Sequence, residues 1–212
     1  MSHFIVLVTG DDVEEALAPF DEQLPMERYQ KYSREEAIKE AKENIKNQKE
    51  TEHYQAYKNS PETYIKQHKP REAQIKWFEE LNQSGTWTDE QFHEVTAKWF
   101  EDEMKDADGN LFSTSNPNAQ WDWYQVGGRW DGYLILKDGT NVNQATKGEI
   151  DWEKTAVPFA ILDKGQWHEH ASMGWWGMTS DDKEESVWKD EFLAVLDKLP
   201  DDTIISSVDC HI

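Results

Sequence analysis

The segment WDWYQVGGRWDGY, residues 121–133, combines aromatic rings, glycines and a single arginine. Arg129 directly follows the pair Gly127–Gly128 and is the only arginine after Arg71. A guanidinium binds phosphate or carboxylate through paired hydrogen bonds, and adjacent glycines let backbone N–H groups approach an anion. Tryptophan and tyrosine rings stack on bases and other rings. These properties predict a site for a small anionic, ring-bearing ligand, formed by Trp121, Trp123, Tyr124, Gly127, Gly128, Arg129 and Trp130.

The same segment also has a structural interpretation. Gly127–Gly128 suits a hairpin turn, the tryptophans suit a hydrophobic core, and Arg129 suits a cation–π contact. Neither the G-x-G-x-x-G spacing nor the P-loop spacing is present, so a standard nucleotide-binding fold is not predicted.

A second aromatic segment is SMGWWGM, residues 172–178. Trp175 and Trp176 are adjacent and are flanked by glycines. This pattern suits a loop that covers a pocket, and it suits equally a loop that folds onto the core. We include both tryptophans in the predicted ligand site.

Histidines near the two ends of the chain form another candidate site. Side chains alternate along a strand, so Asp209 and His211 share one face of a predicted final strand. An antiparallel first strand would bring His3 beside them. His168 and His170 would join if QWHEHA pairs with the first strand; if VPFAIL pairs there instead, they lie farther away. Three histidines and an aspartate suit a divalent metal or acid–base catalysis.

The spacing of these residues matches no common metal-binding or nucleophile motif. No H-E-x-x-H spacing is present, and the segment beginning at Asp106 places Gly109 and Pro117 where an EF-hand would need other residues. We therefore expect no metal ion and no cofactor, and binding without turnover. A metal-dependent hydrolase built on the histidine cluster is an alternative. Cys210 falls on the apolar face of the last strand and is expected in the core.

The formal net charge is −21, with −11 in residues 1–110 and −10 in residues 111–212. This charge repels phosphate backbones, so we expect no direct nucleic-acid partner. One interpretation is a solvated surface that resists aggregation. Another is an acidic inhibitor that mimics DNA and binds a basic site on a host protein.

The cellular compartment follows from cysteine usage and from the N-terminal segment. A single cysteine excludes an intramolecular disulfide. The segment MSHFIVLVTG lacks a basic region, and no run approaches the ~20 apolar residues of a membrane span. We therefore expect a cytoplasmic protein with no membrane partner.

Hydrophobic periodicity and capping signals predict the helices and strands that position these residues. Residues 3–8 predict a buried strand, and residues 33–104 a helical region with capping boxes at Ser33 and Thr88. Residues 184–199 predict an amphipathic helix. The other predicted strands are 133–136, 157–162, 166–171 and 203–212.

This order predicts a single α+β domain over residues 1–212. The expected sheet is antiparallel, with the first and last strands side by side. The plan is a ferredoxin-like βαββαβ fold in which a helical insertion of about residues 30–105 enlarges the first crossover. The segment 33–58 has few apolar positions, so its helix is expected to be largely exposed.

Four blocks resemble a family of uncharacterised tailed-phage and prophage proteins: MSHFIVLVTGDD, NPNAQWDWYQVGGRW, GQWHEHASMGWWG and VDCHI. They cover the N-terminus and most of residues 116–212, whereas the helical insertion carries no resemblance. The resemblance implies a protein of the infected host's cytoplasm that engages antiviral defence. Together with the aromatic segment, it predicts a binding protein that sequesters a nucleotide-type signal.

Overall fold

The computed structural model describes residues 2–173 and 179–212. The chain forms two compact units. Unit 1 comprises Met1–Met26 with Ser115–Ile212 and contains the main sheet, whereas unit 2 comprises Glu27–Thr114 and is mainly helical. The predicted insertion of about residues 30–105 falls within unit 2. The α+β class is confirmed.

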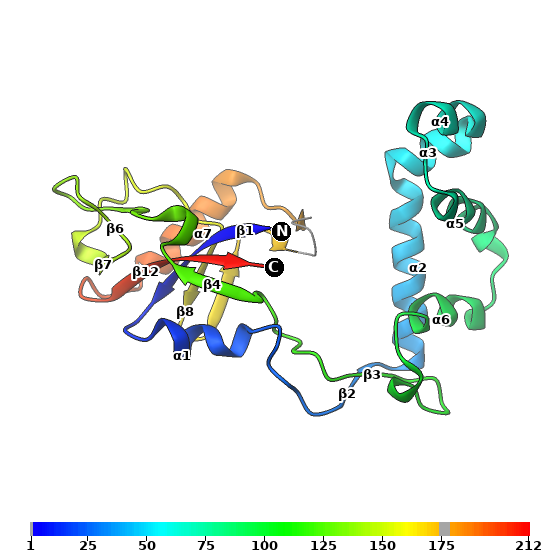
Figure 1. Ribbon diagram of the computed structural model, residues 1–212, viewed down its shortest axis with the longest axis horizontal. Helices are drawn as coiled ribbons and strands as arrows, with labels where there is room; N and C mark the ends of the chain where they lie inside the picture. Colours follow the sequence, from blue (N-terminus) through cyan, green and yellow to red (C-terminus); the bar gives the residue numbers. More distant parts are fainter. Residues whose placement is uncertain (1, 174–178) are drawn as a thin grey trace. The chain divides into compact units, whose positions relative to one another are not determined.

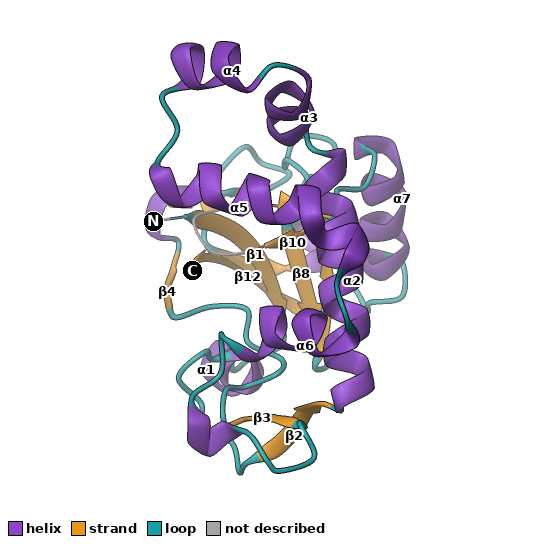
Figure 2. Cartoon of the chain, turned by 90° about the vertical axis from the view of Figure 1, so that its right-hand side faces the viewer, coloured by secondary structure: helices purple, strands orange, loops and turns teal. Residues whose placement is uncertain are grey.

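The main sheet belongs to unit 1 (Figure 2). Its strand order is β4-β12-β1-β8-β9, and β7 also pairs with β12. The strands are β1 (His3–Thr9), β4 (Trp123–Val126), β7 (Gln144–Thr146), β8 (Ala160–Asp163), β9 (Gln166–Glu169) and β12 (Ile204–His211).

Strands β1 and β12 pair antiparallel along the whole of β1, from His3 opposite His211 to Thr9 opposite Ile205. The prediction that the first and last strands lie side by side is confirmed. Both strands are buried over most of their length. Their side chains therefore form the centre of the sheet.

The sheet is mixed, because β1 and β8 are parallel. This finding corrects the prediction of an antiparallel sheet, and the ferredoxin-like plan is not confirmed. The strand in VPFAIL takes the place beside β1, since its residues Ala160, Ile161 and Leu162 are buried. The strand in QWHEHA is more polar and occupies the edge as β9.

Alternation along the strands divides the core of unit 1 into two layers. Phe4, Val6 and Val8 pack with Leu17 of α1 (Val13–Leu17) and Phe20 of η1 (Ala18–Phe20). On the opposite face, a second cluster packs against α7 (Glu185–Leu196), and Figure 1 shows α1 and α7 on opposite sides of the sheet. That cluster contains Leu7, Ile161, Ile205, Trp188 and Phe192.

Shorter elements complete unit 1. A short hairpin with Asp138-Gly139 in its turn joins β5 (Leu134–Ile135) to β6 (Asn141–Val142). The other elements are η4 (Gly128–Trp130), η5 (Lys147–Glu149), β10 (Ser172–Met173) and β11 (Thr179–Ser180).

Unit 2 consists of helices and one two-stranded sheet. The capping boxes at Ser33 and Thr88 are confirmed at the starts of α2 and α6. The strands are β2 (Tyr29–Tyr32) and β3 (Leu111–Ser113). The helices are α2 (Arg34–Glu50), α3 (Glu52–Asn59), α4 (Pro61–His68), α5 (Glu72–Gln83) and α6 (Asp89–Ala97), with η2 (Ser84–Thr86) and η3 (Asp102–Met104).

The core of unit 2 is largely aromatic, because its helices contain few aliphatic residues. Tyr54, Tyr57, Tyr64 and Phe78 contact one another through edge-on and tilted rings. The predicted helix over residues 33–58 is divided at Thr51. Helix α2 buries only Ala37, Ala41 and Ile45 and is largely exposed as predicted, whereas α3 buries Tyr54 and Tyr57. None of the helices in the described part of the chain is long and apolar enough to cross a membrane.

Candidate functional site

The candidate site of unit 1 is organised around Asp209, a carboxylate buried in the sheet at 1% exposure. It lies on β12, opposite Ile5 of β1 and Gln125 of β4. Its Oδ1 accepts a hydrogen bond from His3 Nδ1 at 2.8 Å, and its Oδ2 accepts one from the backbone N–H of Arg129 at 3.0 Å. A buried carboxylate requires such partners, because burial removes its water.

The glycine pair is needed for this arrangement. Gly128 has φ +55°, and a Cβ at this position would lie 2.5 Å from the Cβ of Asp209. The turn therefore lies directly on the carboxylate, and the anion bound by the N–H of Arg129 is the chain's own Asp209. That N–H is therefore not free for a ligand's anion.

A second histidine–aspartate pair lies next to the first. His211 Nδ1 donates to Asp122 Oδ1 at 2.6 Å, and the backbone N–H of Asp122 donates to the carbonyl of His211 at 2.9 Å. The rings of His3 and His211 meet edge-on with centroids 5.0 Å apart. His211 Nε2 is buried and has no hydrogen-bond partner among the residues that the structure describes. In both pairs Nδ1 faces a carboxylate, which fixes the orientation of the ring.

Trp123 completes this face of the sheet. It lies opposite His211 in the β4–β12 register, and its ring meets that of His3 edge-on at 6.1 Å. It is 47% exposed, which is unusual for so large an apolar side chain on a sheet. We call the surface formed by the following five residues the His–Asp face: His3, Asp122, Trp123, Asp209 and His211.

Trp121 and Tyr124 belong to the core instead. Trp121 is 8% exposed, and its Nε1 donates to the carbonyl of Leu17 at 3.1 Å. Tyr124 points to the α1 side of the sheet and meets the ring of Trp121 edge-on at 5.0 Å. For these two residues the structural interpretation of the aromatic segment applies.

Arg129 and Trp130 lie on η4. The side chain of Arg129 is exposed, and within the described residues its guanidinium has no hydrogen bond, ion pair or ring contact. Arg129 is also the only arginine of unit 1. Trp130 is partly buried. The predicted site residues Trp175 and Trp176 lie outside the described residues.

The predicted convergence of five histidine and aspartate side chains is only partly found. His3, Asp209 and His211 meet, but His168 lies on the edge strand β9, separated from β1 by β8. His170 Nε2 bonds to the carbonyl of Lys183 at 2.7 Å. In the part of the chain that the structure describes, no group of three or more His, Cys, Asp or Glu is arranged to hold a metal ion.

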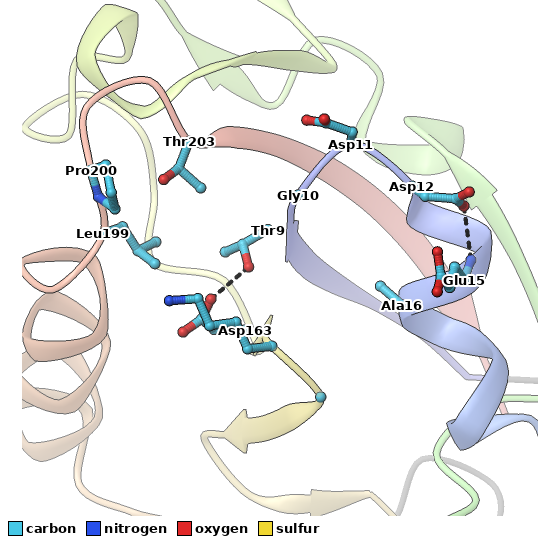
Figure 3. Close-up of a pocket in the computed structure, with 12 residues that line it drawn as sticks. Thr9, Gly10, Asp11, Asp12, Glu15, Ala16, Asp163, Leu199, Pro200 and Thr203 are labelled. Carbon is cyan, nitrogen blue, oxygen red and sulfur yellow. Dashed lines mark hydrogen bonds between the residues drawn. The ribbon is translucent and has the colours of Figure 1, made fainter.

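A separate pocket of about 460 Å³ lies at the carboxyl ends of the parallel strands β1 and β8 (Figure 3). Thr9 Oγ1 donates to Asp163 Oδ1 across it at 2.7 Å. Lys164 is the cationic residue in its lining, whereas four carboxylates surround the space: Asp11, Asp12, Glu15 and Asp163. This lining repels an anionic ligand, so the pocket is not the site that the aromatic segment predicts.

Sequence reasoning missed the role of Asp122. The residue precedes β4, and its contact with His211 depends on the pairing of β4 with β12. No local motif predicts that pairing, because β4 has only four residues and is mostly exposed. The side chain of Asn143 was also missed: it accepts from the N–H of Gly132 and donates to Asp131, and these contacts depend on the fold of the loop between them.

Comparison with known proteins finds no relative of established function. No protein-family model matches the chain, and no curated protein or solved structure is significantly similar to it. The resemblance to phage proteins therefore stays a prediction.

Proposed function

We propose that unit 1 binds a small anionic, ring-bearing ligand of nucleotide type at the His–Asp face, without chemical turnover. The exposed ring of Trp123 stacks on the ring of the ligand, and the guanidinium of Arg129 binds its anionic group. The proposal rests on one observation: the carboxylate of Asp209 is connected to both residues that would contact the ligand, Trp123 and Arg129. Asp209 binds His3, which contacts Trp123, and it also binds the backbone of Arg129.

The backbone that carries Trp123 and Arg129 is already ordered, which favours binding. Trp123 lies on a strand of the sheet and Arg129 on a turn held by a buried hydrogen bond, so little backbone order must be gained when a ligand binds. Stacking of a base on an exposed aromatic ring contributes about 1–3 kcal/mol. A guanidinium without an internal ion pair is free to bind phosphate or carboxylate in bidentate fashion.

In the phage context that the sequence resemblance implies, this binding removes a nucleotide-type defence signal in the cytoplasm of the infected cell. Sequestration needs tight binding and no catalytic group. The proposal therefore assigns His3 and His211 the task of ordering the site.

The test is a thermal-shift and calorimetric screen of the full chain against mono-, di- and cyclic nucleotides. A ligand at a hundred times its dissociation constant stabilises the protein by about 2.7 kcal/mol. Trp123→Ala and Arg129→Ala should each abolish or strongly weaken the shift. Lys189→Ala removes an exposed cation of α7 and serves as the matched control. If no nucleotide shifts the unfolding temperature, the proposal fails.

A second function is favoured by the distribution of charge between the units. Unit 1 contains 8 basic and 24 acidic residues, a formal charge of −16, whereas unit 2 contains 14 and 19, a charge of −5. The acidity is thus concentrated on the unit that holds the sheet. Such a surface suits an acidic inhibitor that binds a basic patch on a host protein.

The two functions respond differently to salt and to substitution. A host protein held by charge should elute from the immobilised chain as salt is raised, because salt screens exposed charges beyond about 8 Å at physiological strength. Trp123→Ala should leave that capture unchanged. Capture that resists salt and depends on Trp123 would contradict the inhibitor function.

A further inference from the structure

Unit 2 contains a cavity that no part of the proposed function uses. It lies between α2, α5 and the end of α6, and its volume is about 540 Å³. This volume falls within the range of about 300–1,000 Å³ that is typical of sites for small molecules. The cavity is lined by Asn44, Gln48, Ala73, Lys76, Trp77, Glu80, Val95, Lys98 and Trp99.

Trp99 is 80% exposed at the rim of this cavity. The spacing of Phe92, Val95 and Trp99 would place all three on one face of a continuous helix, but Trp99 lies beyond the end of the helix. Helix α6 ends at Ala97, so the periodicity that would turn Trp99 inward stops two residues earlier. Its backbone N–H donates to the carbonyl of Thr96 at 3.2 Å, in a turn that follows the helix.

Lys98 lies beside both indoles of the cavity. Its Nζ is 5.0 Å from the centroid of the Trp77 ring and 5.4 Å from that of Trp99. Within the described residues, neither Lys98 nor Lys76 forms an ion pair with a carboxylate. An exposed cation–π contact contributes only a small stabilisation. Because Lys98 has no ion pair with any described residue and its cation–π contacts are weak, its ammonium group remains available to an anion.

We infer that this cavity is a second binding site, specific for a flat aromatic anion. The ring of the ligand packs on Trp99 and Trp77, while its carboxylate or phosphate binds the ammonium of Lys98. Asn44 and Gln48 of α2 offer amide donors and acceptors at the rim. Among the lining residues two cations face the single carboxylate of Glu80, the reverse of the acidic pocket in unit 1.

The chemistry is tested by calorimetric titration of the full chain with three probes. Indole-3-acetate supplies a ring and a carboxylate, tryptamine supplies the same ring with an ammonium, and acetate supplies the anion alone. We expect indole-3-acetate to bind, and tryptamine and acetate to bind at least about tenfold more weakly, since each lacks one of the two contacts. AMP then shows whether phosphate replaces carboxylate. Absence of indole-3-acetate binding, or equal binding of tryptamine, overturns the inference.

Variants locate the site. Trp99→Ala and Lys98→Ala should each weaken indole-3-acetate binding by about fivefold or more, and Lys98→Arg should retain it. Because Trp99 is exposed, its replacement should leave the unfolding transition unchanged. Lys39→Ala, an exposed cation elsewhere on α2, is the matched control.

Trp123→Ala separates this site from the His–Asp face. If Trp123→Ala abolishes indole-3-acetate binding and Trp99→Ala does not, the ligand occupies unit 1. The inference about unit 2 is then wrong, while the proposed function of unit 1 stands. If only the variants of unit 2 weaken indole-3-acetate binding, the inference holds, whether or not unit 1 binds a nucleotide.

Discussion

Gly128 and Asp209 lie so close that no side chain can stand between them. A Cβ on Gly128 would approach the Cβ of Asp209 to 2.5 Å and its Oδ2 to 2.6 Å. The turn of the aromatic segment is therefore built around a buried charge of β12. Two parts of the chain about eighty residues apart depend on each other through this contact.

We expect Gly128→Ala to destabilise unit 1 by about 3 kcal/mol, because it combines left-handed backbone strain with overpacking against Asp209. Gly139→Ala is the matched control. Its φ of +88° imposes strain, but an added Cβ meets nothing within 4 Å, so about 1 kcal/mol is expected. Urea unfolding of both variants measures the difference. Equal losses would show that the contact with Asp209 does not constrain the turn.

The two histidine–aspartate pairs should differ in strength. The side chains of His3 and Asp209 are 14% and 2% exposed, whereas Asp122 is 34% exposed beside His211. Asp209→Asn should therefore cost about 2 kcal/mol, and a double-mutant cycle with His3→Ala should show a coupling of about 1–2 kcal/mol. The cycle of Asp122 with His211 should give less than about 1 kcal/mol. A larger coupling for the outer pair would contradict the burial argument.

Cys210 should be unreactive in the folded protein. It is fully buried on the α1 side of the sheet, and burial raises the pKa of its thiol, so little thiolate forms at neutral pH. A thiol reagent such as 5,5′-dithiobis(2-nitrobenzoate) should modify it only after unfolding in urea. Rapid modification without urea would mean that β12 leaves the sheet easily.

Tyr133 should make stability fall at high pH. Burial raises its pKa to about 12, and its hydroxyl donates to the carbonyl of Ala156 at 3.0 Å. In the unfolded chain the tyrosine has its ordinary pKa of 10.0, so the contribution is complete below pH 10 and is lost as the pH rises towards 12. The urea midpoint of Tyr133→Phe should decline less over this interval than that of the unchanged chain. Identical declines would exclude Tyr133 as the cause.

Sequence patterns formed by neighbouring residues predicted the local structure correctly. The alternation in β1 and β12 identified the faces of Asp209, Cys210 and His211 correctly, and the capping boxes located the starts of two helices. Each of these signals comes from residues that are neighbours in the sequence. Local propensity alone therefore sufficed.

Pairings between distant short strands could not be predicted. The position of β8 beside β1 depends on the competition between two apolar segments, and only packing against both helices decides it. Two residues of the site, Asp122 and Asn143, were missed because their side chains act through tertiary contacts. The exposure of Trp99 was missed because the end of α6 at Ala97 carries no glycine or proline.

The position of β12 between β1 and β4 also determines the order in which the protein can assemble during translation. Residues Glu27–Thr114 form one continuous stretch, so unit 2 has all its partners once that stretch has left the ribosome. The sheet of unit 1 is complete only after Ile204–His211 has emerged, since that strand separates β1 from β4. Until then β1, with its run of buried apolar residues, has an open edge. A nascent chain halted before β12 should therefore carry a folded helical unit and an aggregation-prone first strand.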